Sequence, residues 1–404
     1  MERVNATSLV KMIAVVLAVA LLAGFSYNPL KERIKLGLDL KGGLHVVMEA
    51  QEKEGREVTP DTIQKSIGIL RQRVDELGVE EPIIQGEGNT RIIVELPGVD
   101  NPEAAADVIG QTAELEFKDE NGNVILSGKN LKEARAELDP AGNEPQVSLE
   151  FDKEGAEIFK DFSAANIGKV LGIYLDDRMI SNPTIREVIP NGMARISGGF
   201  ETLKEAEETA VLLRSGALPV SLSIEEKRTV GPTLGSDSLA KSLKAGIIGI
   251  IMILVFMIGY YRVPGTVAAV SLILYACIVL WTMVLLKATL TLPGIAGFIL
   301  SIGMAVDANI IIYERIKDEL RHGKTLKAAI ESGFNRAFWT IFDANVTTLI
   351  AAGVLMFFGT GPIKGFAVTL SIGIIASMFT AITFTRWVLK MVSDLFKKTE
   401  LYVA

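Results

Sequence analysis

The sequence places a carboxylate deep inside an apolar segment, where ionisable side chains are rare. Asp307 lies in the run GFILSIGMAVDANIIIYERIKDEL, residues 297–320, six positions before Tyr313 at the end of the apolar stretch. In a helix that spacing puts the carboxyl group roughly 10 Å inside the boundary. A charge there costs about 2.5–3.5 kcal/mol on insertion scales unless it is neutralised or faces water. Asp307 is therefore a candidate carrier of a proton or another cation.

Three further polar residues complete the predicted proton relay: Asp343, Asn309 and Thr347. Asp343 has an alternative interpretation, because an acid near a helix N-terminus is also favoured by the helix dipole. Burial favours the protonated form of a carboxyl group, so changes in water access switch its charge. Moving one charge through the membrane field is worth about 2.3 kcal/mol per 100 mV, enough to bias a conformational cycle. We expect no cofactor beyond this coupling ion, H⁺ or alternatively Na⁺.

Small residues near these acids predict close helix packing. Stripes of Gly, Ala, Ser, Thr and Asn occur in two apolar runs, at Gly297, Ser301, Ala305, Asn309, Gly373, Ser377 and Thr380. Such stripes let helices approach each other closely in a membrane. We expect them to hide Asp307 from lipid and to leave an ion path between the helices.

Six apolar runs have about the length that a membrane-spanning helix needs. They are Leu9–Phe25, Leu243–Tyr260, Thr266–Leu286, Leu292–Tyr313, Trp339–Phe358 and Phe366–Leu389. The chain of 404 residues is 49% apolar yet 22% charged, so the charges belong to other segments, chiefly a polar insertion between the first two runs. The fold class is a membrane protein with six transmembrane α-helices and a large α+β extracytoplasmic domain.

Lysines and arginines predict the orientation. The segment after the fourth run is basic, with Arg315, Lys317, Arg321, Lys324, Lys327 and Arg336, and so is the C-terminal segment, with Arg386, Lys390, Lys397 and Lys398. The segments after the third and fifth runs offer only Lys287 and Lys364. Both termini are therefore expected to be cytoplasmic, with the large domain outside. The first run is expected to be a retained anchor; the alternative, a signal peptide cleaved after Ala18-Val19-Ala20, would place the cleavage motif inside the apolar run.

Cysteine and histidine are scarce. Cys277, the only cysteine, lies in an apolar run, and the two histidines, His45 and His322, are far apart. The outer domain must therefore fold without disulfides, and no His/Cys metal site is expected.

The polar insertion reads as two α+β lobes. From Leu38 to Phe117 the pattern runs strand, helix, strand, strand, helix, strand, with Thr59-Pro60 opening the first helix and AELEFKD as the fourth strand. This is the βαββαβ order of a ferredoxin-like lobe. A similar order recurs from Gln146, and the last helix and strand are expected to fold back onto the first lobe. Charge-rich stretches such as RVDELGVEEP are interpreted as solvated faces.

The sequence thus divides into six predicted segments. They are a first transmembrane helix at 1–26, a ferredoxin-like base lobe at 27–118, an outer head lobe at 119–199, a return segment and connector at 200–240, a five-helix bundle at 241–390 and a cytoplasmic tail at 391–404. In the connector, VGPTLG predicts a turn, followed by helix caps at Ser236 to Ser238. It is either a hinge between domain and bundle or only a tight connector.

Long stretches of the chain resemble the SecD family of protein-export subunits, within the resistance-nodulation-division superfamily. The stretches are LGLDLKGG at 36–43, VGPTLG, PGIAGFILSIGMAVDANIIIYERIKDELRHGKT and FDANVTTLIAAGVLMFFGTGPIKGFAVTLSIGI. The resemblance implies a motor that uses the proton motive force to assist late steps of translocation, with Asp307 carrying the proton. It also implies coupling or hinge positions at Asp39, Gly42, Gly43, Gly231, Pro232, Gly235, Gly361, Pro362 and Gly365.

The same resemblance implies partners and a location. The partners are SecF, the SecY, SecE and SecG translocon, YajC, an unfolded preprotein and the lipid bilayer of the bacterial cell membrane. No nucleic acid is expected, because the net charge is −7. No G-x-x-x-x-G-K phosphate loop occurs either, so ATP hydrolysis is not expected from this chain.

Two other functions fit parts of the pattern. Half of a small-molecule exporter of the same superfamily would share the bundle, and depletion would then cause accumulation of drugs rather than of unprocessed preproteins. An intramembrane aspartyl protease would use Asp307 and Asp343 as a dyad. The G-x-G-D environment of such proteases is missing, because the nearest upstream glycine, Gly303, lies four residues before Asp307. We therefore expect no catalytic residues and no enzyme activity.

Overall fold

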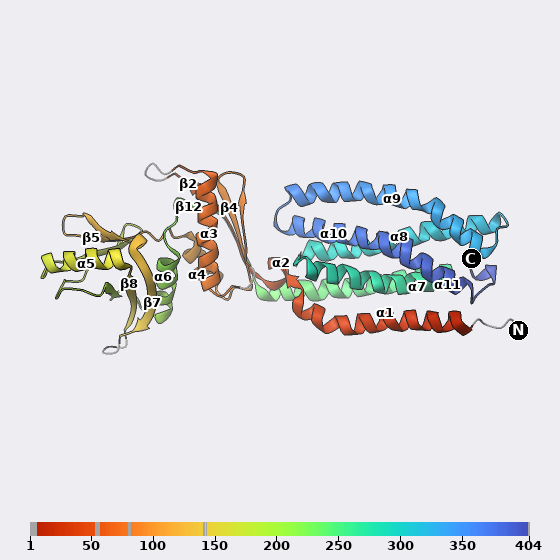
Figure 1. Cartoon of the computed structure of the whole chain (residues 1–404), viewed down its shortest axis with the longest axis horizontal. Coiled ribbons are helices and arrows are strands. Elements are labelled where there is room, and N and C mark those ends of the chain that lie inside the picture. The colour runs from red at the N-terminus through yellow and green to blue at the C-terminus, as the bar shows by residue number, and fades with distance from the viewer. Residues whose placement is uncertain (1–5, 53–56, 80–81, 140–141, 143, 403–404) are drawn as a thin grey trace. The chain divides into compact units, whose positions relative to one another are not determined.

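The chain folds into two compact units. The computed structural model describes residues 6–52, 57–79, 82–139, 142 and 144–402. One unit comprises Met1–Lys41 and Pro232–Ala404 and is helical; the other, Gly42–Gly231, combines strands and helices (Figure 1).

Long apolar helices build the first unit. They are α1 (Ala6–Arg33), α7 (Pro232–Leu285), α8 (Leu292–Arg321), α9 (Leu326–Phe358), α10 (Gly361–Phe379) and α11 (Thr385–Ser393). Short elements accompany them: β1 (Lys35–Leu36), α2 (Leu38–Lys41), β13 (Thr289–Leu290), the π-helical turn η2 (Thr380–Phe384) and the 3₁₀ turn η3 (Thr399–Leu401). Because η2 continues α10 into α11, these three elements form one span with a local widening.

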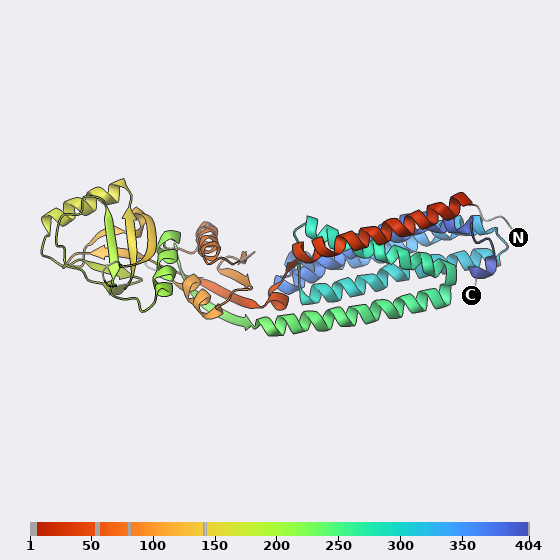
Figure 2. The same ribbon diagram turned by 90° about the horizontal axis from the view of Figure 1, so that it is seen from below.

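Helix α7 contains two spans rather than one. At 1.5 Å per residue a straight helix of its length would extend about 80 Å, far beyond a hydrocarbon core of about 30 Å. Arg262 interrupts it with φ 50° and ψ −112°, and the chain there turns back along the bundle (Figure 2). The turn falls between the second and third apolar runs. The prediction of six spans is confirmed, although α1 and α7 extend beyond their apolar runs.

The first lobe of the second unit is a four-stranded antiparallel sheet with two helices. Its strands are β2 (Gly43–Gln51), β3 (Ile83–Glu87), β4 (Arg91–Pro97) and β12 (Ser221–Val230), in the order β12-β2-β4-β3, with helices α3 (Pro60–Glu76) and α4 (Pro102–Gly110). Counted along the chain, this is the order 4-1-3-2 of a ferredoxin-like sheet. Thr59 caps α3 by accepting a hydrogen bond from the amide of Thr62, with Pro60 at the first position, as predicted.

The fourth strand of this lobe was predicted wrongly. The segment Leu115–Lys118, strand β5, lies in a different sheet, and its place is taken by β12 from the end of the unit. Both segments alternate apolar and polar residues, so periodicity cannot choose between them. The pairing of Ser221–Val230 with β2 along its length shows that β12 is the fourth strand of this sheet.

The second lobe contains two sheets, so the predicted recurrence of the first lobe's order is wrong. Strands β5, β6 (Val124–Ser127), β9 (Gly172–Leu175) and β10 (Arg178–Ser181) form one sheet; β7 (Leu131–Leu138), β8 (Pro145–Phe151) and β11 (Met193–Ser197) form the other. The 3₁₀ turn η1 (Gly128–Asn130) and helices α5 (Lys153–Ala165) and α6 (Leu203–Ser215) complete it. The last helix and strand were expected to fold back onto the first lobe, and β12 does so by pairing with β2. Helix α6 lies between the lobes: Ala206, Ala210 and Leu213 pack into the core of the second, whereas Val211 and Leu212 pack against Val108 of the first.

One charged residue lies at the junction of the two lobes. Arg73 on α3 is fully buried, so its interpretation as part of a solvated face is wrong. Its guanidinium donates hydrogen bonds to the carbonyls of Val108, Gln111, Thr112 and Gly216 and to the Ser215 hydroxyl. These acceptors belong to the two chain segments that pass between the lobes. The side chain therefore ties both crossing segments to α3.

Glycines mark both points where the chain passes between the two units. Gly42 and Gly43 have φ of 79° and 138°, values that side-chain-bearing residues rarely adopt. At the second passage β12 ends at Val230 and α7 begins at Pro232, which suits the first position of a helix. The predicted turn is therefore shorter than expected. Gly235 already lies in the helix, so the predicted caps at Ser236 to Ser238 are wrong.

Candidate functional site

Asp307 lies on α8 and is exposed on the surface of the bundle that this chain forms. Within the described residues its carboxylate has no hydrogen-bond or ion-pair partner. Gly303, one turn before it, is also open, because a Cβ placed there would meet nothing within 4 Å. An unpaired acid at this depth is costly against lipid, so this face requires a cover of protein or water.

The second acid lies at the same depth. Helices α8 and α9 are joined by only a few residues and run antiparallel, and they meet closely where a Cβ on Gly333 would lie 2.5 Å from Ile316. Asp307 lies nine residues before Ile316 on α8, and Asp343 lies ten residues after Gly333 on α9. Both acids are therefore at about the same distance from this contact. Asp343 is exposed and unpaired within the described chain, and Thr347 lies one turn further on the same face.

Asn309 does not join these residues. It follows Asp307 by two positions, or about 200° around the helix axis. Its side chain is 4% exposed, and its amide group donates to the Ala305 carbonyl at 3.1 Å. The side-chain oxygen of Asn309 and the hydroxyl of Tyr313 are both buried without a protein partner. The predicted relay is thus divided between the outer face of α8 and the bundle interior.

The small-residue stripe packs inside the bundle, as predicted, but it does not hide Asp307. Ser301 on α8 is fully buried, and a Cβ on Gly373 of α10 would lie 2.4 Å from its hydroxyl oxygen. Tyr275 of α7 donates to the same hydroxyl at 2.5 Å. Gly297 likewise approaches Phe366 of α10. The stripe brings α7, α8 and α10 together, while Asp307 points away from this contact, so that part of the prediction is wrong.

A buried lysine was missed from the sequence. Lys317 was assigned to the basic loop after the fourth span, yet it lies within α8 and is 2% exposed. Its amine is 3.2 Å from Glu314 and 5.0 Å from the ring centre of Tyr260. Tyr261 donates to the same carboxylate at 3.0 Å. Its spacing of four residues from Tyr313 and eight from Asn309, both on the buried face of α8, was the available signal, but charge alone suggested an exposed anchor.

The predicted coupling residues have structural partners in the helical unit. Asp39 on α2 accepts a hydrogen bond from the amide of Leu292 at the start of α8. At the start of α10, Gly361 has φ 45°, and a Cβ on Gly365 would lie 2.6 Å from the hydroxyl of Thr291. That hydroxyl accepts from the Gly294 amide and caps α8. The glycines therefore let α10 approach the first turn of the helix that carries Asp307.

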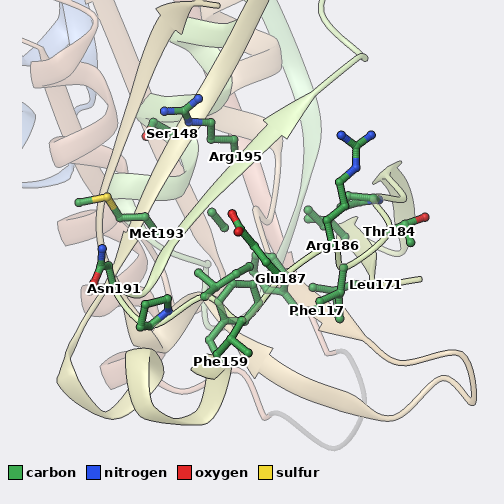
Figure 3. A pocket seen from close by; sticks show the side chains of 17 residues that line it. Phe117, Ser148, Phe159, Leu171, Thr184, Arg186, Glu187, Asn191, Met193 and Arg195 are labelled. Carbon is green, nitrogen blue, oxygen red and sulfur yellow. The ribbon is translucent and has the colours of Figure 1, made fainter. Parts of the chain in front are cut away.

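The second lobe contains an open cavity of about 440 Å³ (Figure 3). Its floor is the lobe's own core, including Phe117, Phe159 and Leu171, all nearly fully buried. Polar and charged side chains lie at the rim: Thr184, Arg186, Glu187, Asn191 and Arg195. An apolar floor with a few polar groups at the rim is typical of a ligand-binding pocket.

Fold and site together define a multi-pass membrane protein in which an unpaired acid faces outward from a six-span bundle joined to an α+β domain. Three family models match the chain. They are the SecDF P1 head subdomain (residues 111–220), the N-terminal part of the SecDF P1 domain (63–122) and the C-terminal model of the protein export membrane proteins SecD/SecF (214–394).

Named relatives agree with these models. Protein translocase subunit SecD of Acidaminococcus fermentans is 52% identical over 94% of this chain and 90% of its own length. The protein of the same name from Dictyoglomus turgidum is 50% identical over 90% and 91%. The chain belongs to the SecD family of protein translocase subunits.

A solved structure supports the fold. The crystal structure of SecDF from Thermus thermophilus, described as a translocon-associated membrane protein, is 39% identical, with a TM-score of 0.66. It is matched over 97% of this chain, but the chain spans only 59% of that protein.

Proposed function

We propose that this chain uses the proton motive force, through Asp307, to assist late steps of protein translocation across the bacterial cell membrane. The observation that carries the proposal is an exposed acid without a partner in the described chain, set on a membrane-spanning helix. A carboxyl group that gains and loses a proton there changes the charge of the bundle. Since one charge moved through the field is worth about 2.3 kcal/mol per 100 mV, the gradient can drive a change between two arrangements.

The outward position of Asp307 supports a second membrane subunit as its cover. The family model that matches residues 214–394 describes both SecD and SecF, and the Thermus protein is named SecDF. We therefore infer that SecF packs against the face of α8 and α9 that bears Asp307 and Asp343. Water enclosed at such an interface would carry the proton, and H⁺ rather than Na⁺ is the proposed coupling ion.

The buried polar atoms of Asn309 and Tyr313 support a second route for water. Buried polar groups are rarely left without a partner, and ordered water commonly satisfies them. Water beside Asn309 would connect the bundle interior with the basic end of the helices. Asp343 and Thr347 lie on the opposite, outer side and would belong to the interface with SecF.

The remaining partners follow from the direction of export. The Lys- and Arg-rich helix ends favour cytoplasmic termini, and the α+β unit would then lie on the outer side of the membrane. There it would meet a preprotein leaving the SecY, SecE and SecG channel, with YajC as an accessory subunit. The cavity above Phe117 and Phe159 offers apolar side chains of that preprotein a binding site.

Asp307→Asn tests the proposal directly. Membrane vesicles containing the variant, SecF and the translocon are loaded with a preprotein, and translocation is measured with and without a proton gradient. We expect the variant to assemble normally but to lose the gradient-stimulated part of translocation, with Asp307→Glu retaining part of it. Asp318→Asn is the matched control, because it removes a carboxylate from the same helix near its basic end.

Three outcomes would contradict the proposal. Gradient-stimulated translocation that is equally fast in Asp307→Asn and in the unaltered chain would exclude Asp307 as the carrier. Stimulation abolished by a sodium ionophore but not by a protonophore would replace H⁺ by Na⁺. Loss of drug export instead of preprotein export would favour the exporter alternative.

A further inference from the structure

A cavity of about 650 Å³ opens between α1, α9 and α11 at the basic end of the bundle. Its volume lies within the usual range of ligand sites. Lysines, carboxylates and apolar side chains all contribute to its lining. The lining includes Lys11, Val15, Lys327, Glu331, Trp387, Lys390, Met391 and Asp394.

The acids of this cavity are already satisfied. Glu331 accepts from Arg386 at 2.8 Å and from Lys390 at 2.7 Å, and Asp394 lies 2.6 Å from the Lys327 amine. These carboxylates therefore neutralise part of the basic charge around them. A ligand would meet these two acids as ion pairs rather than as free negative charges.

The groups left open are donors. Lys11 on α1 is exposed and has no hydrogen-bond or ion-pair partner within the described residues. The same holds for the indole N–H of Trp387, which is 54% exposed. With three lysines against two carboxylates, the lining carries a net positive charge before Arg386 is counted. Open donors and excess positive charge favour an anionic ligand.

The position of the cavity identifies the kind of anion. Lys11 lies two residues inside the apolar run that begins at Leu9, and Val15 lies one turn deeper on the same face. On α11, which runs outward to the basic end, Trp387 lies one turn deeper than Met391 and adds a second apolar wall. Tryptophan is a residue type enriched at membrane interfaces. The basic rim thus lies at the end of the spans, with apolar walls continuing toward the hydrocarbon. A free inorganic anion would use only the rim.

We propose that this cavity binds an anionic glycerophospholipid of the leaflet at the basic end of the bundle. The phosphate lies at Lys11 on the rim, and an acyl chain runs inward along Val15 and the ring of Trp387. Basic pockets between membrane-spanning helices commonly bind anionic headgroups in this way. The lipid fills the gap between α1 and α11 and holds the first helix against the bundle.

Quenching of Trp387 by brominated lipids tests the site. The full chain, carrying Trp281→Phe and Trp339→Phe so that only Trp387 fluoresces, is reconstituted in phosphatidylcholine nanodiscs. Phosphatidylglycerol or phosphatidylcholine brominated on the acyl chains is then titrated in. We expect quenching by phosphatidylglycerol to saturate at a mole fraction about fivefold lower, which corresponds to one lysine contact near the surface.

Variants connect the preference to the cavity. Lys11→Gln is expected to remove the preference for phosphatidylglycerol, and Ala14→Phe, which fills the cavity without changing charge, is expected to reduce quenching by both lipids. Lys398→Gln is the matched control, because it removes the same charge from an exposed position at the same end of the chain, outside the lining. It should retain the full preference.

Three results would overturn the proposal. The first is equal quenching of Trp387 by the two brominated lipids. The second is a phosphatidylglycerol preference that persists unchanged in both Lys11→Gln and Ala14→Phe. The third is reversal of quenching by millimolar glycerol 3-phosphate, which would assign the rim to a free anion. A single-tryptophan chain that retains Trp339 instead should show no headgroup preference, since Trp339 is exposed on α9 outside the cavity.

Discussion

Replacement of Arg73 by methionine tests how the two lobes of the α+β unit are held together. The guanidinium makes five hydrogen bonds, to the carbonyls of Val108, Gln111, Thr112 and Gly216 and to the Ser215 hydroxyl. Methionine has a similar length but no donor, so it fills much of the space and removes all of these bonds.

The expected loss follows from two opposing contributions. Hydrogen bonds from a charged donor contribute about 1.5 kcal/mol or more each, and buried carbonyls left unpaired add a penalty. Against this, burial lowers the pKa of Arg73 to about 10 from its usual 12.5. That shift corresponds to roughly 3 kcal/mol of desolvation cost, which methionine avoids. The bonds outweigh the cost, and we expect Arg73→Met to destabilise the junction by about 4 kcal/mol.

Hydrogen exchange of the full chain measures the effect where it occurs. The amides of Ala113 and Leu218 lie in the two crossing segments and are bonded to Asp176 and to the Thr112 carbonyl. If they exchange by local opening, a loss of this size accelerates their exchange by more than about a hundredfold. Arg71→Met is the matched control, because Arg71 is exposed on the same helix.

Slow exchange of the two amides in Arg73→Met would refute a stabilising role of the five bonds. If Ala113 and Leu218 exchange as slowly in Arg73→Met as in the unaltered chain, the five bonds contribute nothing net. Equal acceleration in Arg71→Met would instead show that loss of charge, rather than loss of the bonds, is responsible. In Arg73→Lys these amides should exchange faster than in the unaltered chain and more slowly than in Arg73→Met, because a single amine cannot reach all five acceptors.

Two further substitutions test packing and turn geometry. Gly373→Val should destabilise the detergent-solubilised chain by about 1–3 kcal/mol, because its Cβ would meet Ser301; Gly249→Val, placed in open space, should leave the thermal midpoint nearly unchanged. Asp176→Ala removes the acceptor of the Ala113 amide at 2.9 Å, and we expect a loss of about 1–2 kcal/mol in urea unfolding. An unchanged thermal midpoint of Gly373→Val would contradict the close contact with Ser301. An unchanged urea midpoint of Asp176→Ala would contradict the hydrogen bond from the Ala113 amide.

Much of the fold could be predicted from the sequence because its signals are local. Apolar runs of membrane length gave six spans, and Thr59-Pro60 correctly placed the start of α3. Strand pairing was less accessible, since β5 and β12 have similar patterns and differ only in the partner that they find. Arg73 was misread for a related reason: its burial depends on carbonyls far away in the sequence, at positions 108–112 and 216.

The candidate site shows the same limit at the level of one helix. Depth along a span can be counted from residue numbers, and this was enough to single out Asp307. The direction in which the acid points depends on which face of α8 meets α10, and the small residues that settle it lie on both helices. Because Ser301 faces Gly373, Asp307 must face elsewhere, and the six spans of this chain leave it uncovered. An acid that is expensive against lipid and exposed within the described chain is the observation on which the proposed interface with a second membrane subunit depends.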